Sequence, residues 1–413
     1  MNKRIYLCLA HMSGNEQKFI QEAFDTNWVV PLGPNVNGFE DDLKMFVGQD
    51  KEVVALSSGT AAVHLALIAC GVQAGDEVIC QSFTFCASAN PVTYLGATPV
   101  FIDSENESWN MDPQLLEQAI LDRKAQTGKY PKAIIPVYLY GMPARIDEIT
   151  AIAAKYDIPV IEDAAEGFGS RFTGQVCGTF GRFGVLSFNG NKMITTSGGG
   201  ALICPDKETK DKIMWYATQA REAYPYYQHE AIGYNYRLSN ICAGIGRGQM
   251  TVIKDHLEHH RHIAMMYQEA FAQIDGITFH SNPSPRYDSN FWLSTILLDE
   301  NLRVKGEENA YAEAVNGAVG GAAGVVHASG NVHTDCEPAV NVEAMRITLD
   351  KVGIESRPLW KPMHKQPVFK NAPAYTNGKS ENIFRHGLCL PSGPMVTDED
   401  VQFIINNIKQ NIL

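Results

Sequence analysis

Short apolar runs alternate with longer amphipathic segments over about residues 50–205. The runs are rich in Val, Ile and Leu, and the segments between them carry apolar residues at helical spacing. We therefore expect strands at 52–56, 77–80, 98–102, 133–137, 159–162, 184–188 and 200–204. We expect helices at 60–70, 84–95, 112–123 and 146–156. This alternation predicts a mostly parallel sheet with helices on both faces.

The pattern changes in the second half of the chain, where a longer helical segment is followed by more widely spaced apolar runs. The same criteria predict one long helix, two strands and a terminal helix, at about 240–274, 291–298, 354–358 and 401–412 respectively. Ligands of mostly parallel sheets bind beyond the carboxyl ends of the strands, so functional residues are expected there.

The length of 413 residues suits one large and one smaller domain. We assign residues 1–250 to a large α/β domain and 251–413 to a smaller α+β domain, and leave open whether the N-terminal segment joins the latter. Residues 304–341 are rich in Ala and Gly, and we interpret them as an insertion into the small domain. The composition, 45% hydrophobic and 19% charged, is ordinary for a globular protein.

The net charge of −12 argues against a nucleic-acid-binding surface. It does not exclude an anionic ligand, which backbone amides can bind in an acidic protein. Nine cysteines without a framework of short spacings predict reduced, mostly buried thiols. His11 interrupts the N-terminal apolar stretch too early for a signal peptide, and no apolar run is long enough for a membrane span. We therefore expect a cytoplasmic protein.

The most informative segment is Ser187-Phe-Asn-Gly-Asn-Lys192, which follows an apolar run and precedes small residues and three glycines. A lysine that forms Schiff bases needs a restricted setting, because its amine must be uncharged for part of the cycle. Small flanking residues leave space for a flat cofactor. Lys192 is therefore the candidate catalytic residue.

Two upstream motifs strengthen this interpretation. Asp163 ends an apolar run, and the Ser-Ser-Gly-Thr segment that includes Gly59 and Thr60 opens a predicted helix. The carboxylate suits the protonated ring nitrogen of pyridoxal phosphate, and the amides at a helix start suit its phosphate. Both motifs also have a plain structural interpretation, because Asp and Ser cap helices in many proteins. Their combination with Lys192 favours a pyridoxal phosphate site.

Two further residues fit the same site. Ser187 could add a hydroxyl to the phosphate site, or simply face solvent at the end of its strand. Phe85 follows a predicted strand end and could stack on the cofactor, although aromatic residues more often lie in the core.

Two other patterns are weaker. His256 and His260 lie four residues apart on a predicted helix, a spacing that metal sites use, but the surrounding order is not that of a zinc protease. We interpret them as part of a solvated or interface helix face and predict no metal site. The run Gly244-Ile-Gly-Arg-Gly248 follows a helical pattern rather than a strand, so a dinucleotide-binding loop is not expected.

Together these blocks resemble the nucleotide-sugar aminotransferases of the DegT/StrS type, which have the type I aspartate-aminotransferase fold. The resemblance covers nearly the whole chain. Beyond the motifs above, it includes the blocks that begin at Trp28 and Phe39, the Glu-Asp-Ala-Ala-Glu block, and Gly233-Tyr-Asn-Tyr-Arg-Leu-Ser239.

The resemblance implies specific roles for these residues. Lys192 would form the Schiff base with pyridoxal 5′-phosphate and then move the proton, and Asp163 would pair with the ring nitrogen. Glu166 occupies the position, often Gln or His, that approaches the ring hydroxyl. Asn235 would reach the phosphate in the neighbouring subunit, which implies a homodimer with shared active sites. The remaining cofactor contacts implied are Gly59, Thr60, Ser187 and Phe85.

A narrower resemblance concerns the block Gly353 to His364. It is similar to the transaminases that make UDP-4-amino-4,6-dideoxy-N-acetylglucosamine in the bacillosamine pathway. It implies substrate contacts from Arg357, Trp360 and His364, and we add His229, although ordinary packing explains these residues equally well. The 304–341 insertion departs from the usual compact length of the family.

The expected activity is transfer of the amino group of L-glutamate to C4 of a UDP-4-keto-6-deoxy-N-acetylhexosamine, for bacterial surface glycans or glycoproteins. A pyridoxal-phosphate-dependent sugar deoxygenase is an alternative, but such family members have His where Lys192 stands. Amination of another keto-sugar is a further alternative. The third is a regulatory protein that binds pyridoxal phosphate without catalysis.

Overall fold

The computed structural model describes residues 4–311 and 336–413. Its largest feature is a sheet of eight strands in the order β14-β3-β2-β4-β5-β8-β9-β1, in which single parallel bridges join β4 to β5. Only β9 runs against the other strands. The predicted mostly parallel sheet is confirmed. The strands are β1 (Glu52–Leu56), β2 (Glu77–Gln81), β3 (Thr98–Ile102), β4 (Ala133–Ile135), β5 (Ile161–Asp163), β8 (Phe183–Ser187), β9 (Gly200–Cys204) and β14 (Ala374–Tyr375).

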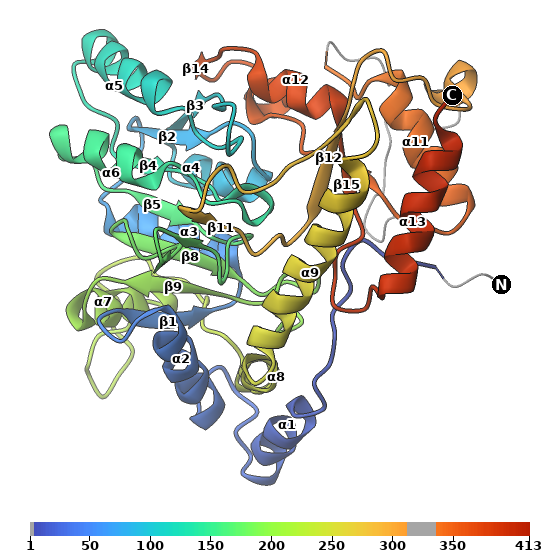
Figure 1. Cartoon of the computed structure of the whole chain (residues 1–413). Coiled ribbons are helices and arrows are strands. Elements are labelled where there is room, and N and C mark those ends of the chain that lie inside the picture. Colours follow the sequence, from blue (N-terminus) through green and yellow to red (C-terminus); the bar gives the residue numbers. More distant parts are fainter. Residues whose placement is uncertain (1–3, 312–335) are drawn as a thin grey trace.

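Helices cover both faces of this sheet (Figure 1). Successive residues of a strand point to opposite faces, so Val53 and Ile79 join one buried cluster while Val54 and Val78 join another. The first cluster is completed by α2 (Pro34–Val47), α5 (Pro113–Thr127) and α6 (Ile146–Lys155). The second is completed by α3 (Gly59–Ala69), α4 (Asn90–Tyr94) and α7 (Lys207–Ala217).

A second, antiparallel sheet has the order β10-β12-β15-β13. These strands are β10 (Ile277–Phe279), β12 (Ser294–Leu298), β15 (Gly387–Leu390) and β13 (Arg357–Pro358). The strands β10, β12 and β15 share a third buried cluster with α9 (Ile253–Phe271), α11 (Val340–Lys351) and α13 (Asp398–Asn411). At the N-terminus, the Ile5 amide donates to Gly353 O at 2.8 Å, so this segment lies against the smaller sheet. The domain boundary at residue 250 stays a prediction.

The remaining elements connect the two sheets. α8 (Asn240–Met250) packs on α1 (Glu16–Asp25) and α2, and α12 (Lys379–His386) precedes β15. A small antiparallel sheet consists of β11 (Tyr287–Asp288), β6 (Arg171–Phe172) and β7 (Gln175–Val176). All nine cysteines are free thiols, and seven are buried. Among the described helices, none has the length and apolar character needed to cross a bilayer.

Three sequence expectations need correction. The helix expected at 84–95 is a 3-10 turn (Cys86–Ser88) followed by the short α4, because Pro91 has no amide and suits only a first helical turn. The helix expected at 240–274 is interrupted between α8 and α9. The strand expected at 133–137 ends at Ile135, because Pro136 cannot donate to the ladder. Most of the expected insertion, residues 312–335, lies outside the described residues.

The interpretation of the α9 histidines as a solvated or interface face was wrong for two of them. His256 and His260 are buried, at 3% and 0% exposure. Their Nδ1 atoms lie 3.1 Å from the carbonyl oxygens of Met193 and Phe291 respectively. These bonds tie α9 to the loop after Lys192 and to the segment before β12. Helical spacing alone could not tell which residues would pack on this face.

The burial of His260 predicts loss of stability in acid. Desolvation lowers its pKa from 6.5 to about 3, so the unfolded chain binds a proton that the folded chain does not. The free energy of unfolding should therefore fall below pH 6.5 by up to about 1.4 kcal/mol per pH unit from this residue. A His260→Asn protein keeps a donor for Phe291 O, and should be less stable at pH 7 because its side chain is smaller.

The stability difference between His260→Asn and the unmodified protein should narrow as the pH falls from 6.5 to 4.5. Urea titrations at several pH values measure it. Parallel stability curves for the two proteins would contradict the assignment to His260, because the other buried histidines are present in both.

Candidate active site

A cavity of about 240 Å³ lies at the carboxyl ends of β1, β2, β5 and β8. This edge is where a mostly parallel sheet exposes strand ends and helix starts, so side chains from distant segments meet there. The structure brings eight of the residues predicted from the sequence to this cavity: Gly59, Thr60, Phe85, Asp163, Glu166, Ser187, Lys192 and Trp360.

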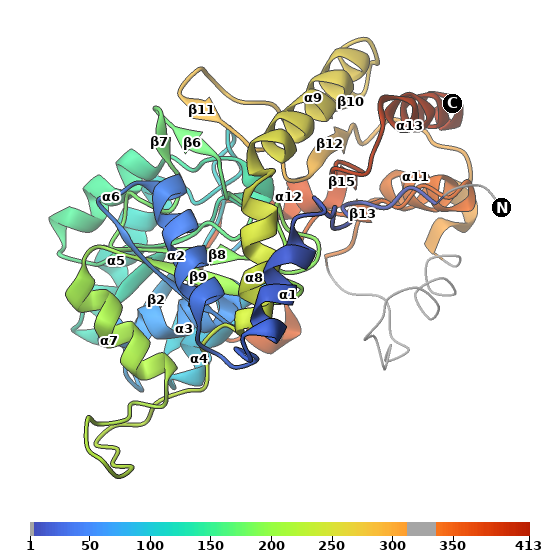
Figure 2. The same cartoon turned by 90° about the horizontal axis from the view of Figure 1, so that it is seen from below.

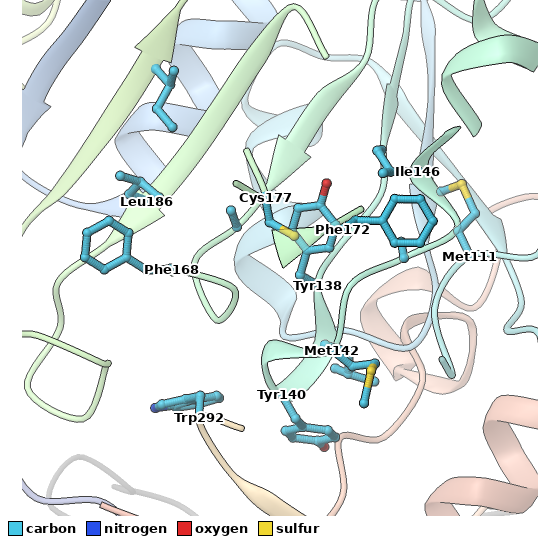
Figure 3. Close-up of a cluster of buried hydrophobic side chains, with 14 of the residues drawn as sticks. Met111, Tyr138, Tyr140, Met142, Ile146, Phe168, Phe172, Cys177, Leu186 and Trp292 are labelled. Carbon is cyan, nitrogen blue, oxygen red and sulfur yellow. The ribbon is translucent and has the colours of Figure 1, made fainter. Parts of the chain in front are cut away.

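Lys192 lies in the loop after β8, and its side chain is 13% exposed. Its Nζ is 3.5 Å from Glu166 Oε1. On another side, Nζ lies 4.0 Å from the centre of the Trp292 ring. Trp292 is one of the side chains drawn in the buried cluster of Figure 3. The amine is therefore confined between a carboxylate and an aromatic face, both within a mostly buried setting.

Asp163 is the last residue of β5 and is 5% exposed. Its Oδ2 accepts a hydrogen bond from Ser88 Oγ at 2.6 Å, and its Oδ1 accepts one from the Ala165 amide at 3.1 Å. Burial raises the pKa of Asp163, whereas these two donors and the charge of Lys192 oppose the rise. A cation placed against this carboxylate would stabilise its charged form.

Glu166 also lines the cavity, and its two oxygens have different partners. Its Oε2 accepts a hydrogen bond from the Tyr140 amide at 2.7 Å, while Oε1 faces Lys192. Burial raises the pKa of Glu166, and the charge of Lys192 is the largest influence against that rise. Tyr140 has φ 54°, so the backbone adopts an uncommon conformation where it meets this carboxylate.

The start of α3 forms an anion site. Ser58 caps the helix, and its Oγ accepts a hydrogen bond from the Ala61 amide at 3.0 Å. The amides of Gly59 and Thr60 precede that of Ala62, which donates to Ser58 O as the first backbone bond of the helix, so they are available to a ligand. A Cβ at Gly59 would lie 3.1 Å from the Ser187 Cβ, and one at Gly200 would collide with the Gly59 amide. Glycine at both positions lets β8, β9 and α3 approach closely.

An aromatic wall closes another part of the cavity. The ring centres of Phe85 and Trp360 are 5.5 Å apart, and Phe85 is 50% exposed. The Trp360 amide donates to the Tyr140 hydroxyl at 2.7 Å, which fixes this segment against the large sheet. Trp360 and Phe85 therefore both line the cavity, and Phe85 lies where a ring could cover a flat ligand.

Four predicted residues do not line the cavity. Asn235 pairs with Thr218 at the base of a hairpin that extends away from the body of the chain (Figure 2). His229 lies on the same hairpin, with Nδ1 2.8 Å from Gln219 O. The other two are Arg357, which is exposed and pairs with Glu355, and His364, whose ring lies between Ser82 Oγ at 2.6 Å and Glu381 Oε1 at 3.1 Å.

Several residues of the site were not predicted. Ser88 and Tyr140 hold the two carboxylates, and Trp292 faces the lysine. The segment after the predicted strand that ends at Cys80 could have suggested Ser88, because it is rich in hydroxyl side chains. Nothing local in the sequence marks Tyr140 or Trp292, since each reaches the site only through tertiary packing.

Comparisons with known proteins agree on one family. The model of the DegT/DnrJ/EryC1/StrS aminotransferase family matches residues 11–319 and 321–409. A protein of Bacillus subtilis (strain 168) with the name "Putative pyridoxal phosphate-dependent aminotransferase EpsN" is 45% identical over 407 residues, which cover 97% of this chain and 94% of that protein.

Two further relatives extend this result. The GDP-perosamine synthase of Escherichia coli O157:H7 is 32% identical over 401 residues, covering 97% of this chain and 96% of the synthase. The crystal structure of a DegT DnrJ EryC1 StrS aminotransferase from Brucella abortus matches with a TM-score of 0.81 at 27% identity. The match covers 96% of this chain and 95% of that one.

Proposed function

The chain belongs to the DegT/DnrJ/EryC1/StrS aminotransferase family, and we propose that it moves the amino group of L-glutamate to C4 of a UDP-4-keto-6-deoxy-N-acetylhexosamine. It is a sugar aminotransferase whose cofactor is pyridoxal 5′-phosphate. The observation that carries the proposal is the position of Lys192 between Glu166 and Trp292 in the cavity. The product would enter the synthesis of bacterial surface glycans or glycoproteins.

The residues present fit this cofactor. The Gly59 and Thr60 amides and Ser187 would hold its phosphate, since the helix start favours anions and the glycines leave room for them. Asp163 would hold the protonated ring nitrogen, whose charge offsets the cost of burying the carboxylate. When bound, pyridoxal phosphate supplies an aldehyde that exchanges amines and a ring that accepts negative charge.

The side chains of the cavity then perform the remaining tasks. Lys192 would remove a proton from the α-carbon of glutamate and later deliver one to C4 of the sugar, because its amine lies inside the cavity. Glu166 would approach the ring hydroxyl and keep the amine near it. Phe85 would cover the ring face and exclude water.

The lining also favours a neutral, deoxygenated sugar. Among the described residues that line the cavity, the charged side chains are Asp163, Glu166 and Lys192. All three are engaged with one another or with the proposed cofactor contacts. Beyond them the lining combines the aromatic rings of Phe85 and Trp360 with hydroxyl and amide side chains, and the rings offer an apolar surface to the methyl group of such a sugar. Arg357 and His364 lie outside the cavity and carry no part of this proposal.

We further propose a homodimer with shared active sites. The hairpin that carries His229 and Asn235 extends away from its own cavity, and Tyr226 and Tyr227 at its tip are 59% and 77% exposed. Large apolar side chains that are exposed in one chain commonly mark a protein interface. Asn235 of each subunit would then serve the phosphate site of its neighbour.

Two half-reactions test the proposed activity. Adding L-glutamate to the cofactor-loaded protein should replace the absorption band of the lysine-bound cofactor with the shorter-wavelength band of pyridoxamine phosphate. Adding the UDP-4-keto-6-deoxy-N-acetylhexosamine should restore the first band and yield an amino sugar. A protein that binds the cofactor but responds to no amino acid would contradict the proposal.

A GDP-linked keto-sugar is the second candidate substrate, and the 32% identity to a GDP-perosamine synthase favours it. Product analysis with matched UDP- and GDP-linked keto-sugars separates the two. We expect a higher kcat/KM for the UDP-linked sugar. A higher kcat/KM for the GDP-linked sugar would identify that sugar as the substrate.

A further inference from the structure

We propose that Trp292 is a positioning residue for the amine of Lys192, and that Asn290 sets the position of both Trp292 and Glu166. The inference rests on the proposed transamination, in which Lys192 must move a proton at two different carbons. Neither residue belongs to the motifs that identify the site.

Trp292 is fixed in the position where it meets the lysine. It is 1% exposed, and its Nε1 donates to Asn191 O at 2.6 Å. The ring centre lies 4.0 Å from Lys192 Nζ, within the range of a cation–π contact. Because the indole N–H is bound to the residue directly before Lys192, the ring and the lysine backbone move together. The aromatic face is therefore a fixed support for a flexible side chain.

Asn290 connects Trp292 to Glu166, the carboxylate that also contacts the amine. Its Nδ2 donates to the carbonyl oxygens of Glu166 and Phe168, both at 2.9 Å. Its Oδ1 accepts the Trp292 amide at 2.8 Å. Asn290 is fully buried, and a Cβ at Gly141 would collide with its Oδ1. One side chain therefore determines where both neighbours of the Lys192 amine stand.

This arrangement has a chemical consequence. A lysine stem has four carbons and many rotamers, and proton transfer requires its amine within hydrogen-bond reach of the reacting carbon. Glu166 at 3.5 Å and the Trp292 ring at 4.0 Å leave the amine few other positions. Removal of the ring should therefore lower kcat more than it changes KM, because substrate contacts remain.

The test compares Trp292→Leu with Trp292→Phe. Both variants lose the bond to Asn191, but only Phe keeps an aromatic face. With the loaded enzyme, kcat of Trp292→Leu should fall about 3- to 30-fold relative to Trp292→Phe, with similar KM values for glutamate. A Trp109→Leu protein is the matched control, since Trp109 is 5% exposed and lies outside the cavity.

A second readout does not depend on turnover. In the cofactor-free protein, the rate at which an amine-reactive reagent labels Lys192 is measured by peptide mass spectrometry, relative to the exposed Lys207. Labelling should be several-fold faster in Trp292→Leu than in Trp292→Phe and in the unmodified protein. Equal labelling and equal kcat in the two variants would overturn the role of Trp292. Failure of the unmodified enzyme to react with any amino acid would instead overturn the proposed function, whatever the labelling shows.

Discussion

A Lys192→Ala protein is expected to lose turnover by at least about a thousandfold, because the acid–base group and the covalent attachment point are removed together. The side chain lines the cavity and belongs to none of the buried clusters, so its loss should leave the fold intact. Steady-state rates with glutamate and the keto-sugar, together with the melting temperature, measure the two effects. Lys207→Ala is the control, since that lysine is 76% exposed.

Chemical rescue makes the test specific. The truncated side chain leaves space between Glu166 and Trp292, which a small primary amine can enter. Methylamine should therefore restore part of the activity of Lys192→Ala in a concentration-dependent way, and should not affect the control. Full activity of Lys192→Ala without added amine would show that another residue moves the proton.

The same variant tests whether active sites are shared. If Asn235 serves the neighbouring subunit, a mixture of Lys192→Ala and Asn235→Ala subunits contains heterodimers with one complete site. After exchange of subunits, the mixture should reach about a quarter of wild-type activity, although each protein alone is nearly inactive. An inactive mixture, with heterodimers demonstrated by tagged subunits, would contradict shared sites.

The parts of the site that the sequence predicted are local. Lys192, Asp163 and Thr60 each follow a strand end within a recognisable motif, and a mostly parallel sheet brings such ends to one edge. Seven of the eight strands of the sheet were predictable for the same reason, since they are apolar runs. The two-residue strands β6, β7, β11 and β14 were not predicted, because two residues carry no periodicity. The short strands β10 and β15 of the smaller sheet were also not predicted.

The supporting residues could not be found in this way. Asn290 donates to the carbonyl oxygen of Glu166, which lies 124 residues earlier in the sequence. The residues next to Asn290 in the sequence do not indicate that contact. His364 shows the opposite failure, because it belongs to a motif-like block but its ring points between Ser82 and Glu381. A motif places a segment near a site, whereas the direction of each side chain depends on what packs around it.

Replacing Asp163 with Asn is expected to lower the turnover and the cofactor affinity of the enzyme, and to stabilise the cofactor-free protein against unfolding. An amide cannot offset the charge of a protonated ring nitrogen, so kcat should fall about 100- to 1,000-fold, and the cofactor should bind less tightly. The amide oxygen can still accept from the Ala165 amide while the amide nitrogen donates to Ser88 Oγ, which keeps the side chain in place. Rates at saturating cofactor and a cofactor titration measure both losses.

The effect on stability has the opposite sign and depends on pH. Burial raises the pKa of Asp163 in the folded chain above its value in the unfolded chain, so the folded state binds the extra proton. The stability from this group is complete below the unfolded pKa and is lost as the pH rises through the folded pKa, by up to about 1.4 kcal/mol per pH unit. The Asn variant has no carboxyl group at this position, so it does not lose this stability as the pH rises.

The melting temperature of cofactor-free Asp163→Asn should therefore exceed that of the cofactor-free parent protein at pH 8, and the gain should shrink towards pH 4. Glu166 adds to the gain, since the charge of Asp163 raises the pKa of Glu166 and the variant lacks that charge. The exposed Asp25→Asn serves as the control and should show no such trend. A gain that is equal at every pH would mean that packing, not the buried charge, separates the two proteins. A pH-dependent gain would mean that the buried charge of Asp163 destabilises the cofactor-free protein. The cationic ring of the bound cofactor would then offset this loss of stability.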